Sequence, residues 1–274
     1  MFSAIARVFR TPDLRRKIFF TLFIIAIYRL GAHVPTPFVN YPNVQSCLRE
    51  TGSASEGLLS LVNLFSGGAL LQLSIFALGV MPYITATIIV QLLRVVIPHF
   101  EALYKEGQAG QAKLTQYTRY LTIALALLQS TTLVTVARSG QLFGTTSIPS
   151  CNSLLTNDAW WAQLLMIITL TAGTGLIMWF AELVTERGVG NGMSILIFTS
   201  IAATFPAAMW SIAQSRGFEV FLLVLIVGII VMGLVVFVEQ SQRRIPVQYA
   251  KRMVGRRTLG GTNTYIPIKV NMAG

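Results

Sequence analysis

Three observations predict that this sequence folds as an all-α, polytopic membrane protein. Hydrophobic residues make up 54% of its 274 residues and charged residues 11%, whereas a soluble domain usually carries about 25% charge. Uncharged apolar blocks of about 20 residues, the length of a helix that crosses a bilayer core, recur along the chain. Lys and Arg are concentrated between alternate blocks, as they are in cytoplasmic loops.

Six blocks are predicted to span the membrane, namely residues 18–37, 74–97, 117–137, 160–181, 191–211 and 218–239. Residues 1–17 form a basic, amphipathic stretch that we expect on the inner leaflet. A helix is predicted to start at Thr11-Pro12-Asp13, because proline is favoured in the first helical turn. Arg29, near the outer end of the first span, is interpreted as an interface anchor.

Residues 57–93 form a run of 37 residues without a charged side chain, too long for one span and too broken for two. Its interruptions are Gly67-Gly68, Gln72, Ser74, Gly79 and Pro82. Irregular backbone at membrane depth survives only when it is buried in protein or lines an aqueous cavity. We therefore expect a short re-entrant half-helix at residues 57–72, followed by the second span. This arrangement predicts an aqueous path, or a segment that moves, inside the protein.

The distribution of charge predicts the orientation of the spans. With the N-terminus inside, 17 of the 21 Lys and Arg residues lie on inner segments. The remaining four are Arg29, Arg49, Arg138 and Arg216. This bias predicts that both ends of the sequence are cytoplasmic and that most of the net charge of +11 faces the inner leaflet.

The two cysteines, Cys47 and Cys151, both fall in predicted outer loops. In an oxidising compartment they can pair, and two free thiols are the alternative, because sequence does not reveal their distance.

A glycine-rich turn, residues 188–192, precedes the fifth span, and Asn191 is predicted to cap the helix that follows. A phosphate-binding loop is the alternative, but the preceding strand that such a loop requires is not indicated.

The last segment, residues 240–274, is predicted to form a basic β-hairpin with strands near residues 245–249 and 264–268. Its basic pairs are Arg243-Arg244, Lys251-Arg252 and Arg256-Arg257. Charge alone favours a loop held by lipid headgroups, and a docking arm for a large anionic partner such as RNA is the alternative.

No catalytic, metal or cofactor site is predicted, and an enzyme is therefore not expected. The two histidines, His33 and His99, fall on opposite sides of the membrane, and no metalloprotease, serine-nucleophile or P-loop motif occurs. Carboxylates lie at span ends, and Glu182 and Glu186 are expected to be solvated. A secondary transporter would need a polar site at mid-membrane, and an intramembrane protease would need a Ser/His or paired Asp site.

Two apolar stripes at helical spacing are compatible with a pore lining, although such stripes are more often packing surfaces. They are Val80, Ile84 and Ile88 on the second span, and Met193, Ile197 and Ile201 on the fifth.

Several ordered motifs closely resemble the bacterial SecY family, whose members are central subunits of the Sec protein-conducting channel. The motifs are NLFSGGALLQLSIFALGVMPYITATIIVQLL at residues 63–93, KEGQAG at 105–110, QYTRYLT at 116–122, VTERGVGNG at 184–192, EQSQRRIPVQYAKRMVGRR at 239–257 and TYIPIKVNMAG at 264–274. The resemblance extends from the first span to Gly274. It implies a SecY-type inverted-repeat channel, of which this chain carries the N-terminal half plus the sixth span.

The resemblance implies a role for four groups of residues. The half-helix at residues 57–72 would be the plug that closes the outer vestibule, including Asn63, Leu64, Phe65, Ser66, Gly67 and Gly68. The hydrophobic pore ring would include Val80, Ile84, Met193 and Ile197; Val80 and Met193 depart from the family's commonest residue, isoleucine. The lateral gate would include Thr87, Ile88, Gln91 and Gln129. The docking arm would carry Arg243, Arg244, Lys251, Arg252, Arg256 and Arg257.

The resemblance also implies the partners and the location. The channel would work with the SecE and SecG subunits and with the SecA motor ATPase or a ribosome, whose rRNA the basic loop would contact. Signal peptides, unfolded preproteins and membrane lipids would be its other partners. The expected location is the inner (plasma) membrane. The family has ten spans, so the rest of the ring and the other gate wall are expected outside this sequence.

Overall fold

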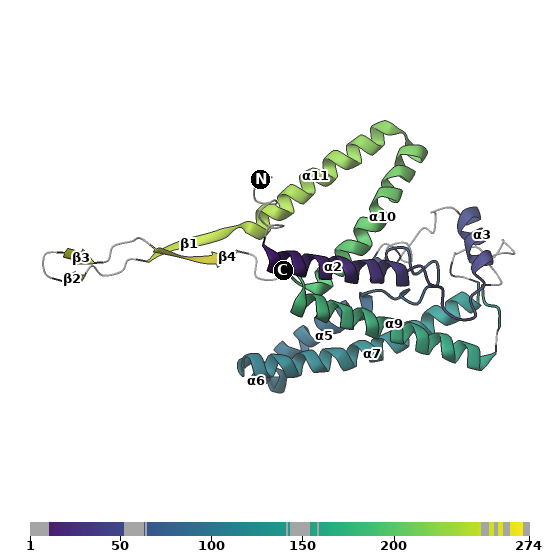
Figure 1. Cartoon of the computed structure of the whole chain (residues 1–274), viewed down its shortest axis with the longest axis horizontal. Helices are drawn as coiled ribbons and strands as arrows, with labels where there is room; N and C mark the ends of the chain where they lie inside the picture. Colours follow the sequence, from purple (N-terminus) through teal and green to yellow (C-terminus); the bar gives the residue numbers. More distant parts are fainter. Residues whose placement is uncertain are drawn as a thin grey trace. The chain divides into compact units, whose positions relative to one another are not determined.

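The computed structural model describes residues 11–51, 63, 65–140, 142, 154–157, 159–247, 252–254, 257–259 and 264–270. The chain divides into two compact units, Met1–Pro206 and Ala207–Gly274. The first unit is helical, and the second contains a long apolar helix and a β-hairpin (Figure 1).

The helices of the first unit are α2 (Pro12–Gly31), α3 (Tyr41–Thr51), α5 (Met81–Val96), α6 (Pro98–Lys105), α7 (Gln108–Arg138), α9 (Trp160–Arg187) and most of α10 (Gly192–Arg216). The two longest, α7 and α9, pack along one another, and α5 packs against α7 (Figure 1). α3 lies over the ends of these helices and contains the buried Cys47, which is disulfide-bonded. The other cysteine, Cys151, lies outside the described residues.

Among the described residues, four helices are long and apolar enough to cross a membrane: α7, α9, α10 and α11 (Phe218–Gln240). The pair α5 and α6, bent by 99°, makes a fifth candidate if it is one broken span. α2 is not among them, because charged residues lie near both of its ends. It begins at Pro12 after the N-cap residue Thr11, as the sequence predicted.

The first two predicted spans differ from the observed helices at their outer ends. α2 ends at Gly31 rather than at residue 37, and α5 begins at Met81 rather than at residue 74. The residues that follow α2 are hydrogen-bonded to the residues that precede α5. The amide of Ile75 donates to the carbonyl of Val34 at 2.9 Å, and both the amide and the hydroxyl of Thr36 donate to the carbonyl of Leu73, at 3.0 and 2.8 Å. Because these groups bond across the two segments, they are not available for a continuing helix.

The non-helical residues 67–80 form the centre of the first unit. Two apolar clusters meet along them, one around Leu70, Leu73 and Leu170, the other around Phe76, Val80 and Ile177. At the junction with α9, a Cβ at Gly173 would overlap the carbonyl group of Ile75. Glycine is therefore required there for the close approach of α9.

The turn before α10 is as predicted. The Asn191 side-chain oxygen accepts a hydrogen bond from the amide of Met193 at 3.0 Å, which satisfies one of the free amides at the helix start. The amide of Gly192 donates to the hydroxyl of Thr185 at 2.9 Å, so the turn is also tied to the end of α9.

In the second unit, α11 is followed directly by the predicted hairpin. Strand β1 (Gln242–Val247) pairs antiparallel with β4 (Thr264–Lys269), with Ile245 opposite Ile266. Further out, β2 (Arg252–Val254) pairs with β3 (Arg257–Leu259). The first strand starts earlier than residue 245. None of the residues of α11 is buried, which fits a helix in contact with lipid or with other protein.

Candidate functional site

The glycine pair of the long uncharged run lies in a compact turn that we call the Gly-Gly turn (residue 63 and residues 65–73). The Asn63 carbonyl accepts from the amide of Gly68 and from the hydroxyl of Ser66, both at 3.0 Å. Its side-chain oxygen accepts from the amide of Leu71 at 3.2 Å. Ser66 is 1% exposed and accepts from the amide of Leu70 at 3.1 Å. Asn63 and Ser66 thus satisfy backbone groups that would otherwise be unpaired.

Of the predicted plug, residues 57–62 and Leu64 lie outside the described residues. Asn63, Phe65, Ser66, Gly67 and Gly68 all belong to the Gly-Gly turn, and Gly67 and Ser66 are buried. The turn therefore lies in the protein interior and contributes Leu70 and Leu73 to one of the two apolar clusters.

The four predicted ring residues lie in one apolar cluster. Val80 is 2% exposed and precedes α5, and the amide of Ile84 donates to its carbonyl at 3.1 Å. Ile84, Met193 and Ile197 are partly buried against the same cluster. Side chains from α5 and α10, more than a hundred positions apart in the sequence, are thereby brought together beside the Gly-Gly turn.

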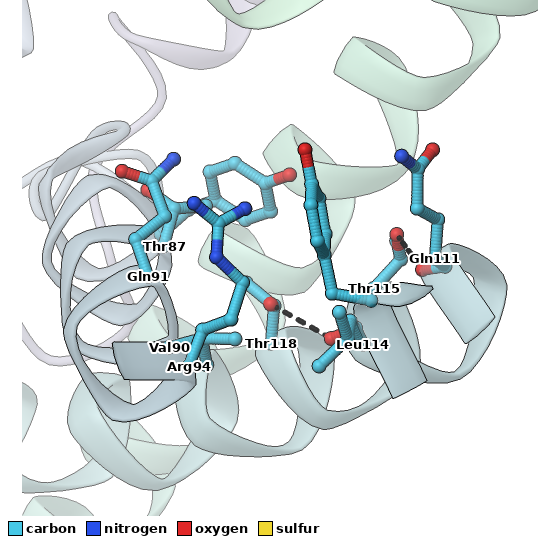
Figure 2. Close-up of a pocket in the computed structure, with 10 residues that line it drawn as sticks. Thr87, Val90, Gln91, Arg94, Gln111, Leu114, Thr115 and Thr118 are labelled. Carbon is cyan, nitrogen blue, oxygen red and sulfur yellow. Dashed lines mark hydrogen bonds between the residues drawn. The ribbon is translucent and has the colours of Figure 1, made fainter. Parts of the chain in front are cut away.

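Two of the four predicted gate residues face a pocket between α5 and α7. Thr87 and Gln91 line this cavity of about 250 Å³, with Arg94 beside them and Gln111 and Thr115 on the opposite side (Figure 2). Ile88 is 51% exposed on the same helix. Gln129 is on α7 but lies three helical turns beyond Thr118, the last α7 residue of the pocket, and does not line it. The Arg94 guanidinium lies over the ring of Tyr104, 4.0 Å from its centroid.

A second cavity, of about 260 Å³, shares one lining residue with the first. Tyr83 lines both cavities, and Met193 lines the second. Its wall includes an ion pair in which Arg119 of α7 donates to Glu182 of α9 at 2.7 Å. The expectation that Glu182 is simply solvated is therefore wrong. The two residues are 63 positions apart, and nothing in the sequence signals their pairing.

The remaining described ion pairs are exposed and form no site. Lys105 donates to Glu101 at 2.7 Å on α6, and this hydrogen bond lowers the pKa of the Glu101 carboxyl. Exposed pairs of this kind contribute little to stability. In the part of the chain that the structure describes, no three His, Cys, Asp or Glu residues are grouped as metal ligands would be.

In the hairpin, Arg243 and Arg244 are exposed on β1 and point to opposite faces, as successive residues of a strand do. The guanidinium of Arg244 is 4.8 Å from the ring centre of Tyr265 on β4. Arg252 belongs to β2 and Arg257 to β3. Lys251 and Arg256 lie outside the described residues.

Comparison with known proteins identifies the family. The SecY family profile matches residues 74–274. The chain belongs to the SecY family. Proteins named protein translocase subunit SecY from Streptomyces scabiei and Micrococcus luteus are 62% and 61% identical to it over its whole length. The chain spans 63% and 61% of the length of these two relatives. The predicted resemblance is therefore confirmed, and this SecY chain is a multi-pass membrane protein.

Solved structures confirm the fold. The one reported as "The structure of a protein conducting channel" matches 97% of this chain with a TM-score of 0.56 and 18% identity, over 57% of its own length. Another concerns the SecY plug domain and matches 97% of this chain with a TM-score of 0.55 and 19% identity, over 56% of its own length. At these identities the likeness shows the fold alone, which is the predicted all-α channel fold of SecY proteins.

Proposed function

We propose that this SecY chain is part of a channel that passes unfolded secretory polypeptides across the membrane and releases hydrophobic segments sideways into the bilayer. The observation that carries the proposal is the apolar cluster shared by Val80, Ile84, Met193 and Ile197 beside the Gly-Gly turn. A narrow, apolar constriction next to an interruption of the membrane-spanning helices is what a closed but openable pore requires.

The ring would work through dewetting. Water leaves a constriction lined by aliphatic side chains, so hydrated ions do not cross it, and the same side chains can yield around a passing peptide without binding it. Val80 and Met193 depart from the commonest family residue, but both are apolar, so the surface that repels water is retained.

The plug would be the segment at residues 57–72, of which the Gly-Gly turn is the described part. For a related protein, the plug domain of SecY is reported to stabilise the closed state of the translocation channel and to maintain a membrane seal. The burial of Ser66 and Gly67 supports the same role here. Thr87, Ile88, Gln91 and Gln129 would line one wall of the lateral gate.

The proposed partners follow from the relatives and from the charge of the chain. SecE and SecG would complete the channel, and the SecA motor or a ribosome would dock on the basic hairpin. A Sec61 chain with a TM-score of 0.53 to this one comes from a canine ribosome–channel complex. The 17 basic residues on predicted inner segments support an inner-membrane location with both ends of this sequence in the cytoplasm.

The complete protein, reconstituted into vesicles with SecE and SecG, tests the proposal. Addition of SecA, ATP and an unfolded preprotein with a signal sequence should make the preprotein resistant to external protease. The same preprotein without its signal sequence is the control. Equal protection of both, or of neither, would contradict the proposed function.

A further inference from the structure

A charged side chain contacts the backbone of the Gly-Gly turn. Arg29, in the last turn of α2, is partly buried, and its Nη1 donates to the carbonyl oxygen of Gly67 at 3.2 Å. Within the part of the chain that the structure describes, no ion pair includes Arg29. Its guanidinium is therefore directed at the turn and at no carboxylate of the described residues.

Gly67 lies close to two helices, α2 and α10. Its φ is +69°, a conformation that favours glycine. A Cβ at this position would lie 2.9 Å from Nη1 of Arg29 and 3.3 Å from the Cα of Ser200 on α10. The bare backbone of Gly67 is thus in contact with both α2 and α10, and a side chain there would push it away from one of them.

The two helices that flank Gly67 are joined by a buried hydrogen bond. Tyr28, which is fully buried, lies 2.7 Å from the Ser200 hydroxyl through its own hydroxyl. The Ser200 hydroxyl donates its single hydrogen to the carbonyl of Leu196 at 3.0 Å, so Tyr28 is the donor to Ser200. This bond fixes the part of α2 that carries Arg29 relative to α10.

We propose that Arg29 is a positioning residue that holds the plug in its closed position, an inference that rests on the proposed function of the Gly-Gly turn. A hydrogen bond from a guanidinium is about twice as strong as one between neutral groups. It is also a single bond to a carbonyl, so it can break when a polypeptide displaces the turn. This role replaces the interpretation of Arg29 as an interface anchor.

The first test is the resting ion leak of vesicles that contain the complete channel. Loss of one charge-assisted hydrogen bond should increase the ratio of open to closed plug by about tenfold, so Arg29→Ala should increase the leak. Arg216→Ala is the matched control, because it removes the same charge from the last turn of α10 without touching the turn. If Arg29→Ala lowers the yield of assembled channel, Arg29→Met, which keeps an unbranched side chain but is uncharged and has no hydrogen to donate to the Gly67 carbonyl, takes its place. A leak equal to that of the parent channel would overturn the proposal.

The second test separates plug release from general damage. The ideal Cβ of Gly67 lies 3.4 Å from the Cβ of Ser200, close to the separation of about 3.5–4.5 Å in a disulfide. Arg29→Ala removes Nη1, the atom that would lie nearest to that Cβ, so in this background Gly67→Cys with Ser200→Cys should crosslink the turn to α10. Oxidation should then reduce the leak of the triple variant, and reduction should restore it. A leak that persists in the fully crosslinked variant would overturn the proposal.

Deletion of residues 57–72 distinguishes this inference from the proposed function on which it rests. If the deletion increases the leak and Arg29→Ala does not, residues 57–72 act as a plug but Arg29 does not hold it. If the deletion leaves the leak and the signal-sequence requirement unchanged, the proposal that these residues form a plug is wrong.

Discussion

At the residue scale, the hydroxyl of Tyr28 is a buried polar group that joins two helices of the first unit. It is fully buried and bonds to Ser200, whose own hydrogen is directed along α10. A buried hydroxyl without a partner costs free energy, so this bond specifies how α2 and α10 meet.

Tyr28→Phe should lower the free energy of unfolding by about 1 kcal/mol, because Ser200 loses its donor while the ring remains packed. The thermal midpoint of the complete channel in detergent measures the effect. Tyr41→Phe is the control, since the Tyr41 hydroxyl is involved in an exposed bond with Gln45. Equal midpoints for the two variants would show that the buried bond does not contribute.

The apolar ring gives a second residue-scale prediction. Ile84→Gly combined with Ile197→Gly should widen and hydrate the constriction, and single-channel or bilayer conductance at rest should rise. Val95→Gly on the same helix is the control, because Val95 is 80% exposed and lies outside the apolar cluster. An unchanged conductance of the double variant would count against a ring at these positions.

The sequence predicted which residues share a face of one helix, but it did not predict contacts between residues far apart in the chain. Val80 and Ile84 could be predicted to lie together because a helix repeats every 3.6 residues. The bond from Arg29 to Gly67 joins positions 38 apart, and the ion pair of Arg119 with Glu182 joins positions 63 apart. Neither pair follows a helical or strand period, so only the tertiary structure reveals them.

At the element scale, the segment between α2 and α5 explains where the sequence-based boundaries were inaccurate. The apolar run indicated a span from residue 74, but the helix begins at Met81. Hydropathy reports burial, and residues 67–80 are largely buried without being helical. The interruption itself was predicted, because Gly67-Gly68, Gly79 and Pro82 disfavour a continuous helix.

The contact of α9 with this segment predicts opposite effects for two neighbouring glycines. A Cβ at Gly173 would overlap the Ile75 carbonyl, so Gly173→Ala should destabilise the protein by about 1–3 kcal/mol. At Gly175 the nearest atom, Cδ1 of Ile123, would be 3.8 Å away, an ordinary contact. Gly175→Ala should therefore be neutral or stabilise α9 by up to about 1 kcal/mol, because alanine favours a helix. Thermal unfolding of the two variants compares them, and a loss of similar size at both positions would contradict the close approach at Gly173.

At the scale of the whole molecule, hydropathy predicts the fold class, and the distribution of charge predicts which face attracts partners. The apolar blocks predicted the fold class, and four described helices satisfy the length and composition of a membrane span. The net charge of +11 says nothing about the fold, but its distribution predicts an inner face that attracts anionic partners. The hairpin carries a large share of that charge, and its pairing as β1 with β4 was predicted from β-branched residues and glycines.

The charge of the hairpin leads to a prediction about docking. Arg256→Glu with Arg257→Glu, between β1 and β4 in the sequence, should weaken binding of the motor or the ribosome by about tenfold or more, because repulsion replaces attraction to an anionic partner. Sedimentation or fluorescence binding to the complete channel in vesicles measures the affinity at two salt concentrations. The loss should shrink at high salt, where charges are screened.

Arg243→Glu with Arg244→Glu is the matched comparison, because it makes the same change of charge at the base of the hairpin, where β1 follows α11. A docking arm that acts through the segment between β1 and β4 predicts a larger loss for the Arg256 and Arg257 pair. A layer of lipid headgroups that simply holds the basic segment predicts equal, small effects for both pairs, which vanish in vesicles without anionic lipid. Unaltered motor and ribosome affinity of both variants at physiological salt would leave the lipid-bound loop as the explanation of the basic pairs.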